Sequence, residues 1–151
     1  MTAGYSGKPL AAKLGLASGQ RLLVVDPPPH FDALVADAPG DLVRLARLST
    51  FDVGWIFATR CTGLAERLAR MLPKLAQGGM IWVSWPKRSS GVATDMSEDR
   101  VRDAALPLGL VDVKVCAVDD TWSGLKLLRR RASPAPPRAR ATPTRGGRGS
   151  R

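Results

Sequence analysis

Three short runs of apolar residues constrain the fold of this chain more than any other feature. They read "RLLVVD" from Arg21, "DVGWIFAT" from Asp52 and "MIWVSW" from Met80. A run that is apolar without alternation is typical of a strand buried on both faces, as the strands of a parallel sheet are. Parallel strands need long crossover connections, which are usually helical. The runs therefore predict an α/β protein with a parallel sheet, and helical patterns should lie between them.

The clearest helical pattern follows the second run. Its apolar residues recur at helical spacing, at Leu64, Leu68, Met71, Leu72 and Leu75. We expect Thr62 to cap this helix, Pro73 to kink it and the pair Gly78-Gly79 to end it.

A second long helix is expected from about Ser97 to Leu106. Either Ser97 caps it, or Asp95 and Glu98 form a capping box. Shorter elements are expected in three places, as helices over Pro9–Leu14 and His30–Ala36 and as a short strand or helical turn over 41–48.

The last part of the chain predicts a strand pair, "LVDVKVCAVD" and "WSGLKLLRR", around the turn "DDTWSG". In the first strand one set of side chains should face one way, namely Val111, Val113, Val115 and Ala117, and a second set the other way, namely Asp112, Lys114 and Cys116. With the parallel strands, this hairpin predicts a small doubly wound, Rossmann-like sheet that is mostly parallel and has an antiparallel C-terminal edge. The helix, Gly-Gly turn, strand and hairpin are similar in architecture to the second half of class I methyltransferases.

Basic residues are unevenly distributed along the chain. The net charge is +10, from 23 Lys and Arg against 13 Asp and Glu. Eight arginines and no acids lie from Arg129 onward, which leaves 15 basic and 13 acidic residues in 1–128, a net of +2. We expect an α/β domain over residues 1–131. Residues 132–151 should form a disordered tail, because this segment is rich in Arg, Pro and Gly and has almost no apolar side chain to bury.

The tail has two interpretations. Its arginines, Arg138, Arg140, Arg145 and Arg148 among them, could contact nucleic acid through the phosphates without sequence preference. Alternatively the tail is a solvated extension that keeps the protein soluble, since no aromatic side chain is interleaved for base stacking.

Other features indicate a cytoplasmic protein. No segment has the roughly 18 apolar residues of a membrane span, and the start of the chain does not resemble a secretory signal. Cys61 and Cys116 stand apart without CxxC spacing, so we expect reduced thiols.

In a doubly wound sheet, ligands bind at the carboxyl ends of the strands. The first loop at that edge is "DPPPH" (26–30). S-adenosylmethionine and dinucleotides are bound at such a turn by glycines and free N–H groups, and three prolines supply neither. We therefore predict no cofactor and no metal. Asp26 and His30 could form an acid–base pair, although a histidine near a helix start is more often a surface or capping residue.

The second loop, "ATRCTG", places Cys61 before a helix start, where a thiolate is favoured, but no partner base is identifiable. The third loop, "WPKRSSGVATD" (85–95), is the densest polar segment of the chain. Lys87 and Arg88 provide fixed positive charges, and Ser89, Ser90, Gly91, Thr94 and Asp95 add small polar groups and a flexible backbone. Trp82 and Trp85 should lie on opposite faces of their strand, so one of them at most lines a given pocket. The loop is either a site for an anion or a partner, or an ordinary connection to a capped helix.

Two longer segments identify a family. "GYSGKPLAAKLGL" and "WVSWPKRSSGVATDMSEDRVRDAALPLGLVDVKVCAVDDTWSGLKLLRRR" resemble a bacterial domain family of unknown function, found in short methyltransferase-like proteins and common in actinobacteria. The resemblance covers residues 3–131 and implies a fold without an activity. We expect the segments Gly4–Leu10, Trp85–Asp95 and Asp119–Gly124 to form one surface. This surface adds four residues to the candidate site, Tyr5, Ser6, Asp120 and Trp122.

Three functions follow from these residues. The sequence favours a domain that is not an enzyme and binds an anionic ligand or a protein partner on a methyltransferase-like frame. An alternative is an enzyme that acts on an anionic substrate with Lys87, Arg88 and Asp95, for which S-adenosylmethionine is the cofactor class that fits best. The third is a nucleic-acid-associated factor that acts through the arginine tail.

Overall fold

The computed structural model describes residues 9–130. They build a six-stranded sheet in the order β2-β1-β3-β4-β6-β5. The strands are β1 (Arg21–Val25), β2 (Val43–Arg44), β3 (Phe51–Phe57), β4 (Leu75–Pro86), β5 (Leu110–Ala117) and β6 (Trp122–Arg129). The first four strands run parallel, whereas β6 pairs antiparallel with both β4 and β5. The predicted mostly parallel sheet with an antiparallel C-terminal edge is therefore confirmed.

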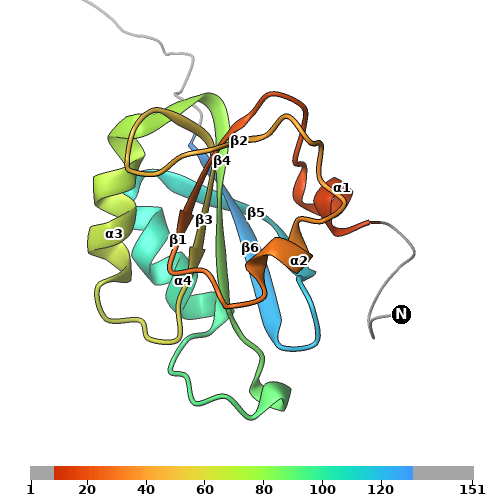
Figure 1. Ribbon diagram of the computed structural model, residues 1–151. Coiled ribbons are helices and arrows are strands. Elements are labelled where there is room, and N and C mark those ends of the chain that lie inside the picture. Colours follow the sequence, from red (N-terminus) through yellow and green to blue (C-terminus); the bar gives the residue numbers. More distant parts are fainter. Residues whose placement is uncertain (1–8, 131–151) are drawn as a thin grey trace, which may run out of the picture.

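Helices cover both faces of this sheet. The α-helices are α1 (Leu10–Leu14), α2 (Phe31–Leu34), α3 (Leu64–Met71) and α4 (Glu98–Ala105), and the 3-10 helices are η1 (Leu72–Lys74), η2 (Arg88–Ser90) and η3 (Leu106–Leu108). Figure 1 shows α3 and α4 on one face and α1 and α2 on the other. None of the helices in residues 9–130 is long and apolar enough to span a membrane.

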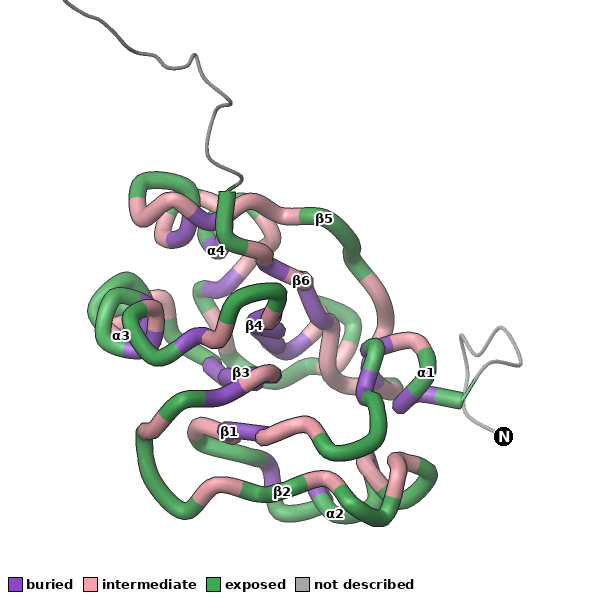
Figure 2. The backbone as a smooth tube through the Cα atoms, turned by 90° about the horizontal axis from the view of Figure 1, so that it is seen from above, coloured by how far each residue is buried: buried purple, intermediate pink, exposed green. Residues whose placement is uncertain are grey.

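Each face of the sheet has its own hydrophobic core. Figure 2 shows that buried positions gather along the central strands β3 and β4. Trp85 belongs to the core under α3 and α4, whereas Trp82 belongs to the core under α1 and α2, as the alternation along β4 predicts. The Trp82 indole N–H donates to the carbonyl of Leu14 over 2.9 Å, which fixes α1 to the sheet.

The predicted boundaries of α3 are wrong at both ends. The residue that precedes the helix is Gly63, with φ +83°, and Thr62 makes no capping hydrogen bond. At the other end the α-helix stops at Met71, and Pro73 lies in η1. Proline has no N–H to continue the helical hydrogen bonds, so the chain enters β4 as early as Leu75. The pair Gly78-Gly79 is consequently part of β4 and does not end a helix.

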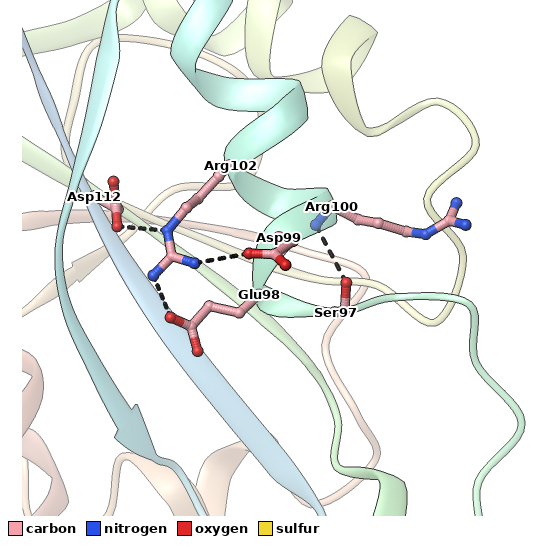
Figure 3. A network of polar contacts seen from close by, with 6 residues as sticks. All are labelled: Ser97, Glu98, Asp99, Arg100, Arg102 and Asp112. Atoms are coloured by element: carbon pink, nitrogen blue, oxygen red, sulfur yellow. Dashed lines mark hydrogen bonds and ion pairs between the residues drawn. The ribbon is translucent and has the colours of Figure 1, made fainter.

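The structure decides between the two proposed caps of α4. The Ser97 hydroxyl accepts a hydrogen bond from the Arg100 N–H over 3.2 Å, as Figure 3 shows. Asp95 takes no part in a capping box, because its carboxylate instead accepts from the N–H of Cys61. Ser97 with Glu98 and Asp99 in the first turn is therefore the correct interpretation.

The strict alternation predicted for β5 is wrong, because the strand contains a bulge between Asp112 and Lys114. Asp112 lies opposite Leu127 and Val115 lies opposite Leu125. Both leucines belong to the core under α3 and α4. Paired residues of antiparallel strands share a face, so Asp112 and Val115 lie on the same face. They are three residues apart instead of two, because the bulge inserts one residue.

Candidate functional site

The three loops predicted to carry chemistry do lie at one edge of the sheet, because β1, β3 and β4 are parallel and this edge holds their carboxyl ends. The second and third loops are hydrogen-bonded to each other. The Thr94 hydroxyl donates to the carbonyl of Thr59 over 2.7 Å, and the N–H of Cys61 donates to the Asp95 carboxylate over 2.7 Å. Loop 87–97 is therefore held against the end of β3.

Loop 87–97 and the start of α4 enclose an open hollow of about 510 Å³, which we call the β4 hollow. Its walls are formed by Arg88, Gly91, Val92, Ala93, Thr94, Asp95, Met96, Ser97 and Arg100. Four of the predicted site residues thus line one hollow, namely Arg88, Gly91, Thr94 and Asp95. Lys87, Ser89 and Ser90 do not line it, and Trp85 is buried in the core.

Most hydroxyl groups of the loop hold the loop itself. The Ser90 hydroxyl donates to the carbonyl of Lys87 over 2.6 Å and accepts from the N–H of Val92 over 3.2 Å. The Thr94 hydroxyl, besides its bond to Thr59, accepts from the N–H of Met96 over 3.0 Å. These groups were predicted to be ligand donors, but their hydrogen bonds stabilise the wall of the hollow.

Two arginines are the free cationic groups of the hollow, which also holds the exposed carboxylate of Asp95. Within residues 9–130, the guanidinium groups of Arg88 and Arg100 make no hydrogen bond or ion pair, and both residues are exposed. Figure 3 shows the Arg100 side chain extending away from the ion-pair cluster around Arg102. Arg100 was missed in the sequence. A signal for it existed, since a helix capped by Ser97 places Arg100 in its first turn beside the polar loop.

The first loop has a turn that does not fit the cofactor suggested by the fold. Asp26 has φ +53°, in the left-handed region, and its carboxylate pairs with Arg67 over 2.9 Å. The next three residues are prolines without N–H groups, and Pro28 is buried. No glycine lets a phosphate or a ribose approach the backbone, and no N–H points from these residues to an anion. The residues of this turn therefore do not fit S-adenosylmethionine or a dinucleotide in the usual manner.

The possible acid–base pair of Asp26 and His30, which was the less favoured interpretation, is not formed, because each residue has another partner. His30 Nε2 lies 2.8 Å from Asp119 Oδ2, in the turn between β5 and β6. The other Asp119 oxygen accepts the N–H groups of Thr121 and Trp122. His30 and Asp119 line a separate hollow of about 430 Å³ that Leu10 and Val118 also line.

Two of the three segments predicted to form a common surface, 85–95 and 119–124, lie within the described residues. Trp85 pairs with Ser123 across β4 and β6, and the Lys87 N–H donates to the carbonyl of Thr121 over 2.7 Å. Residues 85–87 thus lie beside residues 121–123, so the segments 85–95 and 119–124 are neighbours there. Asp120 is exposed, whereas Trp122 packs edge-on against Phe57 with the ring centroids 5.2 Å apart.

Several predicted site residues cannot be placed. Tyr5, Ser6, Arg138, Arg140, Arg145 and Arg148 lie outside the described residues.

A family model matches residues 49–131, which is more than half of the chain. The chain belongs to the family described as "Protein of unknown function (DUF3052)". The DUF3052 match begins just before β3 and includes the β4 hollow, the turn at Asp119 and the whole hairpin. The turn from Asp26 to Pro29 lies before the matched region.

Solved structures with a similar fold include methyltransferases. The ribosomal protein L11 methylase of Lactobacillus delbrueckii subsp. bulgaricus aligns with a TM-score of 0.56 and 11% identity, over 81% of this chain and 77% of that one. A SAM dependent methyltransferase of Aquifex aeolicus aligns with a TM-score of 0.52 and 11% identity, over 83% of this chain and 90% of that one. A protein of the NADB-Rossmann superfamily from Streptococcus agalactiae aligns with a TM-score of 0.52 and 13% identity, over 88% of this chain and 72% of that one. Comparison with curated proteins finds no match. At these identities the similarity shows that the DUF3052 chain has a methyltransferase-like Rossmann fold.

Proposed function

We propose that this protein is a binding domain that holds a small anionic ligand in the β4 hollow and is not a methyltransferase. The observation that carries the proposal is the pair Arg88 and Arg100, which line the hollow and have no partner within residues 9–130. Guanidinium groups bind carboxylates and phosphates through paired N–H donors.

The place and the size of the hollow support this proposal. Ligands of doubly wound sheets bind beyond the carboxyl ends of the strands, which is where loop 87–97 lies. The volume of about 510 Å³ lies within the usual range for small-molecule sites. The bonds from Thr94 and Asp95 to loop 59–61 hold the wall in one conformation, which lowers the entropic cost of binding.

Two features favour binding over chemistry. Asp95, the acid of the alternative enzyme hypothesis, uses one carboxylate oxygen to accept the N–H of Cys61. Lys87 does not line the hollow, so the three residues of that hypothesis do not converge on one point. The hollow therefore supplies two positive charges for an anion, without the convergence of Lys87, Arg88 and Asp95 that the enzyme hypothesis requires.

Isothermal titration of the full-length protein with pyrophosphate, citrate and ATP tests the proposal. We expect at least one of these probes to bind saturably. The Arg88→Ala and Arg100→Ala variants should each weaken that binding by at least about tenfold, since a hydrogen bond to a charged group is worth about 1.5–3 kcal/mol. Lys74→Ala is the matched control, because Lys74 is exposed in η1 and does not line the hollow.

Other results would contradict the proposal. Equal weakening by Lys74→Ala would show a general charge effect without a site. Saturable binding of S-adenosylmethionine in the same titration would instead support the methyltransferase alternative.

A further inference from the structure

One part of the sheet has no helix over it. The connection from β2 to β3 consists of residues 45–50 and contains no helix. Figure 2 shows this connection passing beside β1 on the side of the sheet that carries α3. A groove of about 360 Å³ remains between α3, β1 and this connection, and we call it the β1 groove.

The floor of the β1 groove is apolar. Leu23 of β1 and Met71 of α3 belong to the core under α3 and α4, and Val25 and Leu45 pack against that core. Leu48 lines the groove and is 36% exposed, which is high for a leucine. Leu23 and Met71 are already buried, whereas Val25 and Leu45 are half-buried, so the accessible apolar surface of the groove comes from these two residues and Leu48.

The rim of the β1 groove is basic. Arg47, Arg67 and Arg70 line it, together with the single acid Asp26. Arg67 is paired with that acid over 2.9 Å. Within residues 9–130, the side chains of Arg47 and Arg70 have no hydrogen-bond or ion-pair partner, and both residues are exposed. After the pair of Asp26 and Arg67 is subtracted, two positive charges remain beside an apolar floor.

We propose that the β1 groove binds an amphipathic anion. The apolar chain or ring of such a ligand covers Val25, Leu45 and Leu48, and its carboxylate or phosphate head lies between Arg47 and Arg70. The volume of about 360 Å³ is at the lower end of the range for small-molecule sites, which suits a single short chain. The charge of the rim excludes a cationic ligand and makes a neutral one a weaker binder.

This site is separate from the one described above. The β1 groove and the β4 hollow share no lining residue. The proposed site in the β1 groove goes beyond the proposed function and does not depend on it. An experiment can therefore contradict one of the two proposals and leave the other standing.

Fluorescence of 1-anilinonaphthalene-8-sulfonate with the full-length protein tests the proposal, because this probe is itself an amphipathic anion. We expect a saturable rise in fluorescence that decanoate and decyl phosphate reverse, whereas decanol and acetate do not. The two anions differ in head group, so their relative strength identifies the preferred head. Arg47→Ala and Arg70→Ala should each raise the dissociation constant about three- to fivefold, as expected for an exposed charge pair.

One control variant and one further variant complete the test. Lys74→Ala removes an exposed charge that lies outside both the groove and the β4 hollow, and it should leave probe binding unchanged. Leu48→Asp puts a negative charge on the floor at an exposed position and should abolish binding without lowering the melting temperature. Displacement by decanol as strong as that by decanoate would overturn the proposal. Binding that is unaffected by Arg47→Ala, Arg70→Ala and Leu48→Asp would overturn it as well.

Discussion

At the scale of single residues, Ser84 shows how a polar group is accommodated in this core. It is fully buried in β4, and its hydroxyl accepts a hydrogen bond from the Trp55 indole N–H over 2.8 Å. Trp55 is also fully buried, so this N–H has no access to water. The apolar run "MIWVSW" predicts the strand but not this pair, because Trp55 reaches Ser84 only through the register of β3 and β4.

Ser84→Ala should therefore destabilise the fold by about 1–3 kcal/mol, the cost of leaving a buried donor unsatisfied. Urea unfolding followed by tryptophan fluorescence measures this. Ser89→Ala is the matched control, because Ser89 is exposed and makes no hydrogen bond within residues 9–130. A double variant with Trp55→Phe removes both partners and should lose less stability than the sum of the two single variants. A loss equal to that sum would contradict the role of the hydrogen bond.

At the scale of elements, a network of ion pairs joins α4 to β5. The Arg102 guanidinium contacts Asp112 of β5 over 2.7 Å, Asp99 over 3.1 Å and Glu98 of its own helix, as Figure 3 shows. The hydrogen bond from Arg102 holds the pKa of the Asp112 carboxyl below its ordinary value of 3.8. Because the bulge in β5 turns Asp112 to the α4 face, the same irregularity that the sequence did not predict makes this contact possible.

The lowered pKa predicts how acid affects stability. The folded protein gives up the Asp112 proton more readily than the unfolded chain, so the pair contributes stability above the unfolded-state pKa. This contribution is lost as the pH falls through the lower folded-state pKa. The free energy of unfolding, measured in urea at about pH 7 and about pH 3, should therefore change less in Asp112→Asn than in the wild type. Asp103→Asn is the control, since Asp103 is exposed on α4 without a partner in residues 9–130. An unchanged pH dependence in Asp112→Asn would disprove the assignment.

The elements also show where sequence patterns are sufficient and where they are not. The predicted apolar stripe is correct as far as Met71, since Leu64, Leu68 and Met71 are buried in α3, whereas Leu72 lies in η1 and Leu75 in β4. The predicted end of this helix at Gly78-Gly79 is wrong, because a Gly-Gly pair is typical of a helix end but also occurs in a strand that lies very close to its neighbour. A Cβ on Gly79 would lie 2.7 Å from the Asp52 carbonyl oxygen, so the neighbouring strand requires this glycine. That contact is tertiary and leaves no local signal.

The candidate site likewise has one part that the sequence predicts and another that only the fold brings together. The polar composition of residues 85–95 predicts this loop, which the structure places at 87–97, and its position follows from the order of the parallel strands. The pairs His30–Asp119 and Cys61–Asp95 join residues far apart in the chain, and the spacing within each segment contains no information about them. The sequence also does not show that Arg47 and Arg70 line one groove. That groove exists because the connection between β2 and β3 contains no helix.

At the scale of the whole molecule, the charge is concentrated at one end of the chain. Residues 1–128 carry a net charge of +2, whereas the full chain carries +10. A segment rich in arginine releases counterions from nucleic acid wherever it contacts the phosphates, whatever the base sequence. The fold itself carries little net charge, so nonspecific affinity for a polyanion should belong to the C-terminal segment.

Removal of residues 132–151 tests this assignment. It deletes five arginines, namely Arg138, Arg140, Arg145, Arg148 and Arg151, and lowers the net charge from +10 to +5. We expect full-length protein to bind a random DNA duplex at low salt. Its plot of log K against log salt should be steeper than that of the truncated protein by up to about 4.5, since each neutralised phosphate contributes about 0.9 to the slope. A full-length variant with these five arginines changed to serine separates charge from length, because it keeps the segment and should behave like the truncation. Equal affinity and equal slope for all three proteins would show that the basic tail makes no contact with nucleic acid.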